Sequence, residues 1–322
     1  MMERTRKFAR SPAVAPAIFA AALFVAGCST LSPQGKTLVP TRFQTRTGPY
    51  AVFTNGPLDA DTPAIRHLSS LQHELERSLG WRVDPEQAPV EVYILDDGEA
   101  FSHFLKFHYP DLPPRRAFFL AQGERRVVYT FNSDRLEEDL RHEATHALLH
   151  AGVSDLPLWL DEGLAEYFEV PEDRDGLNEE HLRRLPRDLA EGWTPDLKRL
   201  ESLVEVRRMT PRDYRESWLW VHYLLHGPKR DRADLLAYLA DLHDDANAQP
   251  LSARLEDRRQ TRDARLLAHL NDVQQDAVAV LSRPPDASVT RFQDAGGEPF
   301  PRRARLGPRR GFFGRVFSAF GM

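Results

Sequence analysis

The sequence predicts an α+β protein in which a small mixed sheet and an HExxH-bearing helix pack on a C-terminal helical subdomain. Strand-like runs are confined to residues 48–131, whereas apolar residues at helical spacing dominate residues 133–282. Runs of strands followed by runs of helices are typical of this class. With 322 residues, of which 41% are hydrophobic, the chain is long enough to bury one large core or two small ones. Disorder throughout and a multi-span membrane protein are excluded.

The individual elements follow from apolar spacing and from turn residues. The pair Thr62-Pro63 predicts the start of a helix that Gly80 ends, and residues 122–124 predict a hairpin turn. The expected strands cover residues 49–53, 90–95, 117–121 and 126–131, and helices are expected near 63–79, 101–107, 133–151, 158–169, 177–190, 211–226, 231–243 and 251–281.

The first 27 residues predict a lipoprotein signal peptide. Four basic residues precede an apolar run from Ser11 to Val25, which is short for a membrane span. Cys28, the only cysteine, follows directly, and this segment resembles the lipobox of bacterial lipoproteins, whose cysteine is lipidated and becomes the mature N-terminus. The alternatives are an ordinary cleaved signal peptide or a short membrane anchor. Ser29 after the cysteine implies, by the same resemblance, an outer-membrane lipoprotein that faces the periplasm.

Composition divides the remaining chain into three parts. Residues 28–45 predict a polar tether, residues 46–282 a folded domain and residues 283–322 a disordered tail of arginines and aromatics. Within the domain, residues 46–170 form the expected α/β part with the motif helix and residues 171–282 the helical part.

The charge of these parts bears on the possible partners. Removal of residues 1–27 removes four basic residues and one acidic residue, which moves the net charge from −5 to −8. Residues 283–322 carry eight arginines and three acids, so residues 28–282 are left with about −13. This acidic body excludes nucleic acid as its main partner, because phosphate binding needs clustered lysine and arginine. The tail is either solvated or contacts anionic lipid or an acidic polymer.

The segment His142-Glu143-Ala144-Thr145-His146 is an HExxH motif on a predicted helix. Residues four apart lie on one helix face, about 6 Å apart along the axis, so the two imidazoles can converge on one cation. The intervening Glu143 is placed to hold and deprotonate a metal-bound water. The alternative is a pair of solvated histidines.

A catalytic zinc site needs a third protein ligand and one open position. Glu162, on the next predicted helix, can supply it. His150 lies two helical turns from His142, about 12 Å along the axis, and cannot share that metal. Glu166, one turn beyond Glu162, either replaces it as ligand or hydrogen-bonds the far nitrogen of a ligating histidine.

At these residues the sequence resembles the gluzincin metallopeptidases, the group of thermolysin and aminopeptidase N, and most closely their peptidase-MA-like relatives. The run Trp159-Leu160-Asp161-Glu162-Gly163-Leu164-Ala165 matches the glutamate helix of that group. The interhelix loop is a few residues shorter than in the best-known members, which keeps both glutamates open. The resemblance implies a zincin-like fold with one zinc ion per chain, held by His142, His146 and Glu162, with Glu143 as general base.

The resemblance also suggests an oxyanion donor. In the aminopeptidase branch a later helix begins with a tyrosine in this role, and the matching position is Tyr214. The alternative is a core tyrosine beside Trp218, and His222 and Tyr223 are weaker candidates. The Gly-x-Met-Glu-Asn strand of that branch is absent from this sequence, so aminopeptidase specificity does not carry over.

The sequence therefore predicts a lipid-anchored, zinc-dependent metallopeptidase that hydrolyses peptide or protein substrates in the cell envelope. One of the strands before the motif helix, residues 117–121 or 127–131, is expected to hold an extended peptide at its edge. The alternatives are a catalytically silent gluzincin-fold lipoprotein that acts as a binding or envelope-assembly module, and a cell-wall amidase. Substrate, endo- or exopeptidase action and oligomeric state stay open.

Overall fold

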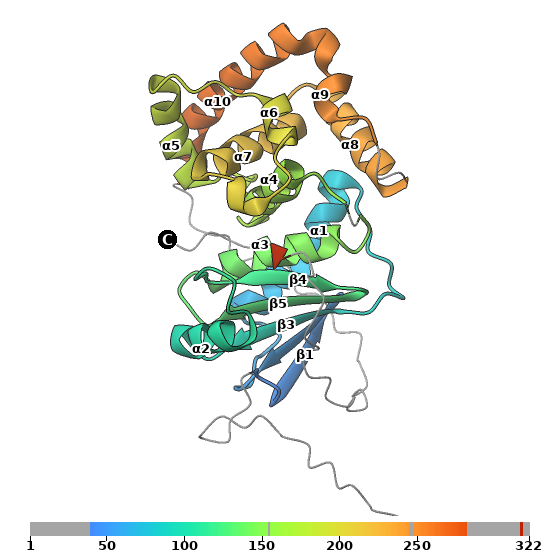
Figure 1. Ribbon diagram of the computed structural model, residues 1–322, viewed down its shortest axis with the longest axis vertical. Coiled ribbons are helices and arrows are strands. Elements are labelled where there is room, and N and C mark those ends of the chain that lie inside the picture. The colour runs from blue at the N-terminus through green and yellow to red at the C-terminus, as the bar shows by residue number, and fades with distance from the viewer. Residues whose placement is uncertain (1–38, 154, 245–247, 282–315, 318–322) are drawn as a thin grey trace, which may run out of the picture. The chain divides into compact units, whose positions relative to one another are not determined.

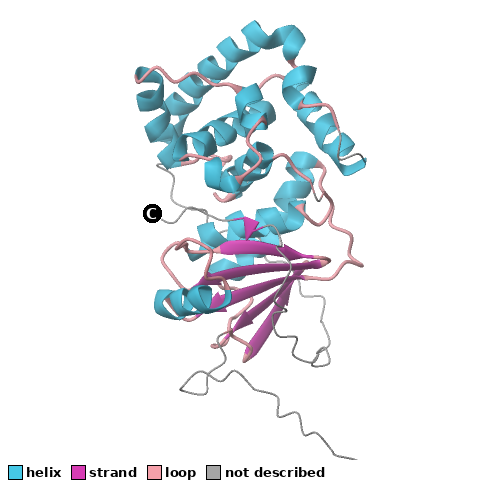
Figure 2. Cartoon of the chain, viewed as in Figure 1, coloured by secondary structure: helices cyan, strands magenta, loops and turns pink. Residues whose placement is uncertain are grey.

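The computed structural model has the predicted α+β class, with a mixed sheet followed by helices (Figures 1 and 2). The described residues all belong to one compact unit, residues 38–322. Cys28 and the whole predicted signal peptide lie outside the described residues, as do most of the predicted tether and tail. The described residues are 39–153, 155–244, 248–281 and 316–317.

The sheet has the strand order β1-β2-β3-β5-β4-β6. The strands β2, β3 and β5 run parallel to one another, whereas β1 pairs antiparallel with β2, and β4 pairs antiparallel with both β5 and β6. The predicted hairpin is therefore β4–β5, with Gly123 in the left-handed conformation at its turn. The strands are β1 (Phe43–Thr47), β2 (Tyr50–Thr54), β3 (Val90–Leu95), β4 (Phe118–Gln122), β5 (Arg125–Phe131) and β6 (Val316–Phe317).

The helices begin and end close to the positions that the sequence indicates. Pro63 opens α1, and Gly80, at a φ of 69°, ends it. At the start of α7, Asp213 accepts hydrogen bonds from the backbone N–H and the hydroxyl of Thr210. The helices are α1 (Pro63–Leu79), α2 (Gly98–His108), α3 (Leu136–Leu149), α4 (Leu158–Phe168), α5 (Glu179–Ala190), α6 (Leu197–Glu201), α7 (Pro211–His226), α8 (Lys229–Asp244), α9 (Leu251–Arg254) and α10 (Arg259–Leu281).

α6 and β6 correspond to no expected element, and β6 lies in the segment expected to be a disordered tail. Two further features depart from the expected elements. The strand β1 begins at Phe43, inside the segment expected to be a tether. Its sequence does not indicate a strand, because its side chains are mostly polar and alternate between half-buried and exposed. The helix expected over residues 251–281 is divided, since a short 3₁₀ turn over residues 256–258 separates α9 from α10.

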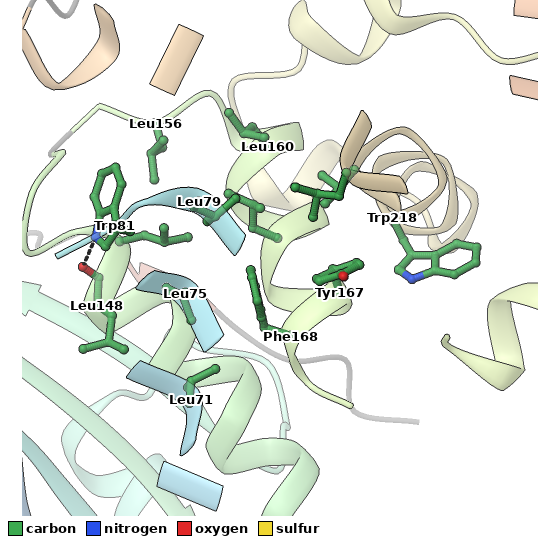
Figure 3. Packing of buried hydrophobic residues seen from close by; sticks show 14 of the residues in the cluster. Leu71, Leu75, Leu79, Trp81, Leu148, Leu156, Leu160, Tyr167, Phe168 and Trp218 are labelled. Carbon is green, nitrogen blue, oxygen red and sulfur yellow. Dashed lines mark hydrogen bonds between the residues drawn. The ribbon is translucent and has the colours of Figure 1, made fainter. Parts of the chain in front are cut away.

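Side chains on the two faces of the sheet enter two separate apolar clusters. Phe119 and Val128 face the larger cluster, which α1, α3 and the helical part share, whereas Phe118 and Val127 face a smaller cluster with α2. Figure 3 shows the larger cluster where α1, α3 and α4 meet, with the indole of Trp81 donating to the carbonyl of Leu148 at 3.0 Å. This continuous core fixes α3 and α4 against each other.

The helices α4 and α7 cross at close range at Gly163. A Cβ atom on this glycine would lie 2.7 Å from the carbonyl oxygen of Ser217 and 2.9 Å from Cγ2 of Val221. Only a residue without a side chain allows this backbone approach. The close crossing carries the neighbouring Glu162 and the first turn of α7 toward the same place.

Candidate functional site

The motif helix α3 is almost wholly buried, and its two histidines face α4. His142, Glu143 and His146 are at most 2% exposed, and Glu162 on α4 is fully buried. The Nε2 atoms of the two histidines lie 3.3 Å apart. Oε2 of Glu162 lies 3.8 Å from Nε2 of His142 and 3.7 Å from Nε2 of His146. The three predicted ligands are therefore brought together.

Each imidazole is oriented by a carboxylate on its far nitrogen. Nδ1 of His146 lies 2.8 Å from Oδ1 of Asp161, and Nδ1 of His142 lies 2.9 Å from Oε2 of Glu169. A carboxylate accepts the Nδ1 proton, which leaves Nε2 of a neutral ring as a bare acceptor. Burial raises the pKa of Asp161, but His146 and His150 outweigh this and lower it below its usual range, so Asp161 is ionised.

The carboxylate of Glu162 has no hydrogen-bond partner for either oxygen among the described residues. When both imidazoles are neutral, three acceptor atoms thus converge in a buried space with no donor between them, an arrangement that is costly unless a proton or a cation lies there. A tetrahedral ion with bonds of about 2.0–2.1 Å needs ligand atoms about 3.3–3.4 Å apart. The observed 3.3 to 3.8 Å separations fit such an ion.

His142, His146 and Glu162 are called the triad below, and the charges around them favour positive charge on the imidazoles. Burial alone would lower the pKa of His142, yet the carboxylates of Glu162 and Glu169 raise it well above its usual value. The pKa of His146 is also raised, against its burial, by Asp161 and Glu162. The surrounding carboxylates thus favour a positive charge at the two imidazoles.

Glu166 contacts a different set of residues. Its Oε2 lies 2.8 Å from Nε2 of His181 and 3.3 Å from Nδ2 of Asn178, which also donates to Glu169 at 2.6 Å. Burial raises the pKa of Glu166, but His181 lowers it overall, whereas burial and the charge of Glu166 raise the pKa of Glu169. Glu166 and Glu169 form a second group with His142, with ligand atoms within 4.8 Å, yet their hydrogen bonds are already made.

Tyr214 lies on the first turn of α7 and is 3% exposed. Burial first, and then the charges of Glu162 and Glu166, raise its pKa far above 10, so its hydroxyl keeps its proton. The Tyr214 hydroxyl therefore lies in the electrostatic field of Glu162 and Glu166.

A residue outside the predicted set also faces the site. Arg115 precedes β4, is partly buried and donates from Nε to the carbonyl of Pro113 at 3.2 Å. Burial lowers the pKa of its guanidinium, while Glu143, Tyr214 and Glu162 raise it, in that order. No carboxylate in the described part of the chain forms a salt bridge with Arg115. Arg115 is therefore a cation in the field of the site's carboxylates that forms no direct ion pair with a described residue.

The other candidates have structural partners. His150 lies 2.8 Å from Oδ2 of Asp161, so Asp161 links it to His146 without placing it in the triad. His222 forms a 2.8 Å hydrogen bond with His269, and the hydroxyl of Tyr223 donates to Asp231 at 2.6 Å.

The outer partners Asp161, Glu169, Asn178 and His181 are not among the site residues that the sequence predicts. A signal for Asp161 was present, since it directly precedes Glu162 and lies fifteen residues after His146. Glu169 follows the end of α4, and Asn178 and His181 begin α5 after a loop, so no helical spacing relates them to the histidines.

One protein-family model matches the chain, over residues 138–251, and describes a protein of unknown function (DUF1570). The match covers about a third of the chain and includes the motif helix, both glutamates of α4 and Tyr214. Among curated proteins, none matches the chain.

Proposed function

We propose that this protein is a zinc-dependent metallopeptidase of the gluzincin type, with a zincin-like arrangement of its sheet and motif helix. The observation that carries the proposal is the buried convergence of two Nε2 atoms and the unpartnered Glu162 carboxylate. Two imidazoles and one carboxylate are a ligand set that suits zinc and leaves a fourth position open. Glu162, rather than Glu166, is the third ligand in this proposal, because Glu166 is already bound to His181.

A zinc ion held there supplies Lewis acidity, which polarises a substrate carbonyl and makes a water molecule a better nucleophile. Glu143, adjacent to His142 and fully buried, takes the proton from the attacking water. The same carboxyl then gives this proton to the amide nitrogen as the C–N bond breaks. Low exposure keeps bulk water from competing for the proton.

Tyr214 and Arg115 are placed to bind two different groups of the substrate, of which the first is the carbonyl oxygen on which negative charge develops. The Tyr214 hydroxyl donates a hydrogen bond, and its raised pKa keeps it a donor across the physiological range. The guanidinium of Arg115 binds the next carbonyl or carboxylate of the peptide, since no salt bridge within the described residues holds it elsewhere.

In this proposal the enzyme is anchored in the bacterial cell envelope by a lipid on Cys28 and acts on peptides or proteins there. The supporting features are the lipobox-like run and the polar residues that follow it. No helix in the described part of the chain is long and apolar enough to cross a membrane.

The test measures zinc and hydrolysis in the full chain, purified without added metal. We expect about one zinc per chain in the wild type and in Glu143→Gln, loss of zinc in His146→Ala, and hydrolysis of unstructured casein peptides by the wild type alone. A wild-type protein that takes up no zinc after supplementation would overturn the metal proposal. Zinc binding without hydrolysis of peptides would overturn the peptidase proposal and favour a binding module, while cleavage of peptidoglycan alone would favour an amidase.

A further inference from the structure

The chain that enters β4 lies along the motif helix α3. Nε of Arg116 lies 3.1 Å from both carboxylate oxygens of Asp139, and its Nη2 lies 2.7 Å from Oδ1. Three residues later, the ring of Phe119 is stacked on the imidazole of His146, with centroids 6.4 Å apart. Glu143 lies between these two contact points on α3. The chain before β4 is therefore held beside the proposed general base.

Arg115 belongs to this stretch of chain, and the end of its guanidinium is unbonded. Nε donates to the carbonyl of Pro113 at 3.2 Å, but Nη1 and Nη2 form no hydrogen bond or salt bridge with any described residue. Burial lowers the pKa of this guanidinium, and Glu143, Tyr214 and Glu162 raise it, so their charges act on it. A partly buried cation without a counter-ion is costly, which suits it to a ligand that brings negative charge.

The two terminal nitrogens of Arg115 fit a carboxylate better than a peptide carbonyl. A guanidinium presents them in one plane, at a spacing that matches both oxygens of a carboxylate. Hydrogen bonds between two ionised groups are also about twice as strong as those between neutral groups. A peptide carbonyl offers one oxygen and no net charge, so it would leave the cation unmatched.

The position of Arg115 near Glu143 indicates which carboxylate is bound. In the proposed reaction Glu143 gives a proton to the leaving nitrogen. In the last residue of a peptide, this nitrogen and the free carboxylate are bonded to the same Cα atom. A cation close to Glu143 therefore meets the α-carboxylate of a C-terminal residue, whereas an internal residue has a neutral amide at that point.

We propose that Arg115 binds the free α-carboxylate of the substrate, so that the enzyme removes single residues from the C-termini of peptides. Water adds its hydroxyl to the penultimate carbonyl carbon, the C–N bond breaks, and the leaving amine keeps the proton that Glu143 delivers. This exopeptidase action rests on the proposed peptidase function, whereas carboxylate binding by Arg115 does not. Arg116 cannot take the role, because Asp139 already binds its guanidinium.

The first test measures peptide binding without catalysis, by calorimetry on the full chain treated with EDTA. The probes are N-acetyl-Phe-Ala-Ala with a free C-terminus, the same peptide as its C-terminal amide, and N-acetyl-Phe-Ala-Glu-amide, whose only carboxylate is in a side chain. The variants are Arg115→Gln and Arg115→Lys, which keeps the charge but loses the planar pair of nitrogens. The control is Arg82→Gln, which removes an arginine whose side chain is 81% exposed.

We expect the wild type and Arg82→Gln to bind the free acid about 10- to 100-fold more tightly than either amide. Arg115→Gln is expected to bind all three peptides alike, and Arg115→Lys to keep part of the preference. The proposal is overturned if the wild type does not prefer the free acid, or if Arg115→Gln retains the preference. It is also overturned if the glutamate side chain binds as tightly as the free C-terminus, which would indicate recognition of an acidic residue instead.

The second test identifies the products of the zinc-loaded protein by mass spectrometry. We expect single amino acids from the C-termini of casein peptides and at least about tenfold slower hydrolysis of peptides with an amidated C-terminus. Cleavage at internal bonds with no preference for a free C-terminus would leave the peptidase function intact and overturn the role of Arg115. Selective binding of the free acid by a protein that hydrolyses nothing would support the role of Arg115 and remove only the proposed catalysis.

Discussion

Two fully buried glutamates on the tightly packed pair α4 and α7 have opposite surroundings. Glu216 accepts from the backbone N–H of Asp196 at 2.5 Å and from Trp193 and Arg199 at 3.1 and 2.7 Å. Glu162 accepts no hydrogen bond from any described residue. A buried carboxylate without donors costs several kcal/mol, so a stable fold retains one only where something else compensates it. Burial alone does not distinguish a structural carboxylate from the proposed ligand, whereas the number of hydrogen-bond donors around each carboxylate does.

The sharpest test replaces each glutamate by glutamine. Glu162→Gln is expected to lower zinc affinity about 10³-fold, since zinc sites worth about 10–16 kcal/mol share that energy among few ligands. It is also expected to make the metal-free fold more stable, because it removes a buried charge that accepts no hydrogen bond. Glu216→Gln is expected to lower the free energy of unfolding by about 3 kcal/mol with little effect on zinc. Chelator competition and urea unfolding in EDTA measure the two effects. If both variants kept zinc and lost the same free energy of unfolding, the two glutamates would not differ in the way described.

Two tyrosines on α7 extend the contrast. Tyr214→Phe removes the proposed oxyanion donor, and we expect kcat to fall about 10²- to 10³-fold with zinc content unchanged. Tyr223→Phe removes a hydrogen bond to Asp231 and is expected to lower stability by about 1–2 kcal/mol while sparing kcat. Steady-state kinetics on the zinc-loaded proteins decide this, and equal kcat for both variants would exclude the role of Tyr214.

The outer carboxylates have a smaller effect. Asp161→Asn removes the acceptor that orients His146, so we expect zinc affinity to fall about 10- to 100-fold. The matched control is Asp139→Asn on α3, which is equally buried but pairs with Arg116. If both variants lowered zinc affinity alike, the loss would reflect damage to α3 rather than orientation of the ligand.

His222 and His269 lie away from the triad, and their pKa values are lowered, whereas those of His142 and His146 are raised. Burial first, and then neighbouring histidines, lower the pKa of His222 well below 6.5 and that of His269 to about 4. Between pH 6.5 and 4 the unfolded chain binds more protons at these histidines than the folded chain does. Their contribution to the free energy of unfolding is therefore complete above pH 6.5 and is lost as the pH falls toward 4. His269→Gln is expected to recover about 1–2 kcal/mol of this loss, after allowance for its partial exposure. Urea unfolding at pH 7.5 and 4.5 measures it, and an unchanged difference between these pH values would refute it.

The motif helix and the place of Glu162 on the next helix could be predicted from the sequence because both depend on local spacing. His142 and His146 share a helix face by their separation of four, and the run around Glu162 begins a second helix after Pro157. The sequence could not indicate interactions between separate elements. Examples are the hydrogen bond between Glu169 and His142 and the electrostatic effect of Glu143 on Arg115. These depend on how α3, α4 and the segment before β4 pack.

The strands show the same limit. β2 to β5 have apolar runs that identify them, whereas β1 is half polar and β6 is a two-residue segment in an arginine-rich tail. Neither sequence carries a pattern that distinguishes a strand from a linker, because only the partner strand makes them pair.

The crossing at Gly163 has a consequence for how a metal would enter and leave. With Ser217 in contact with the glycine, α4 cannot rotate about its axis to swing Glu162 outward without separating two packed backbones. The ligands are thus ordered during folding, and their conformational entropy is lost before any ion arrives. Preorganisation of this kind makes exchange of a bound ion slow, limited by transient opening of the helix pair.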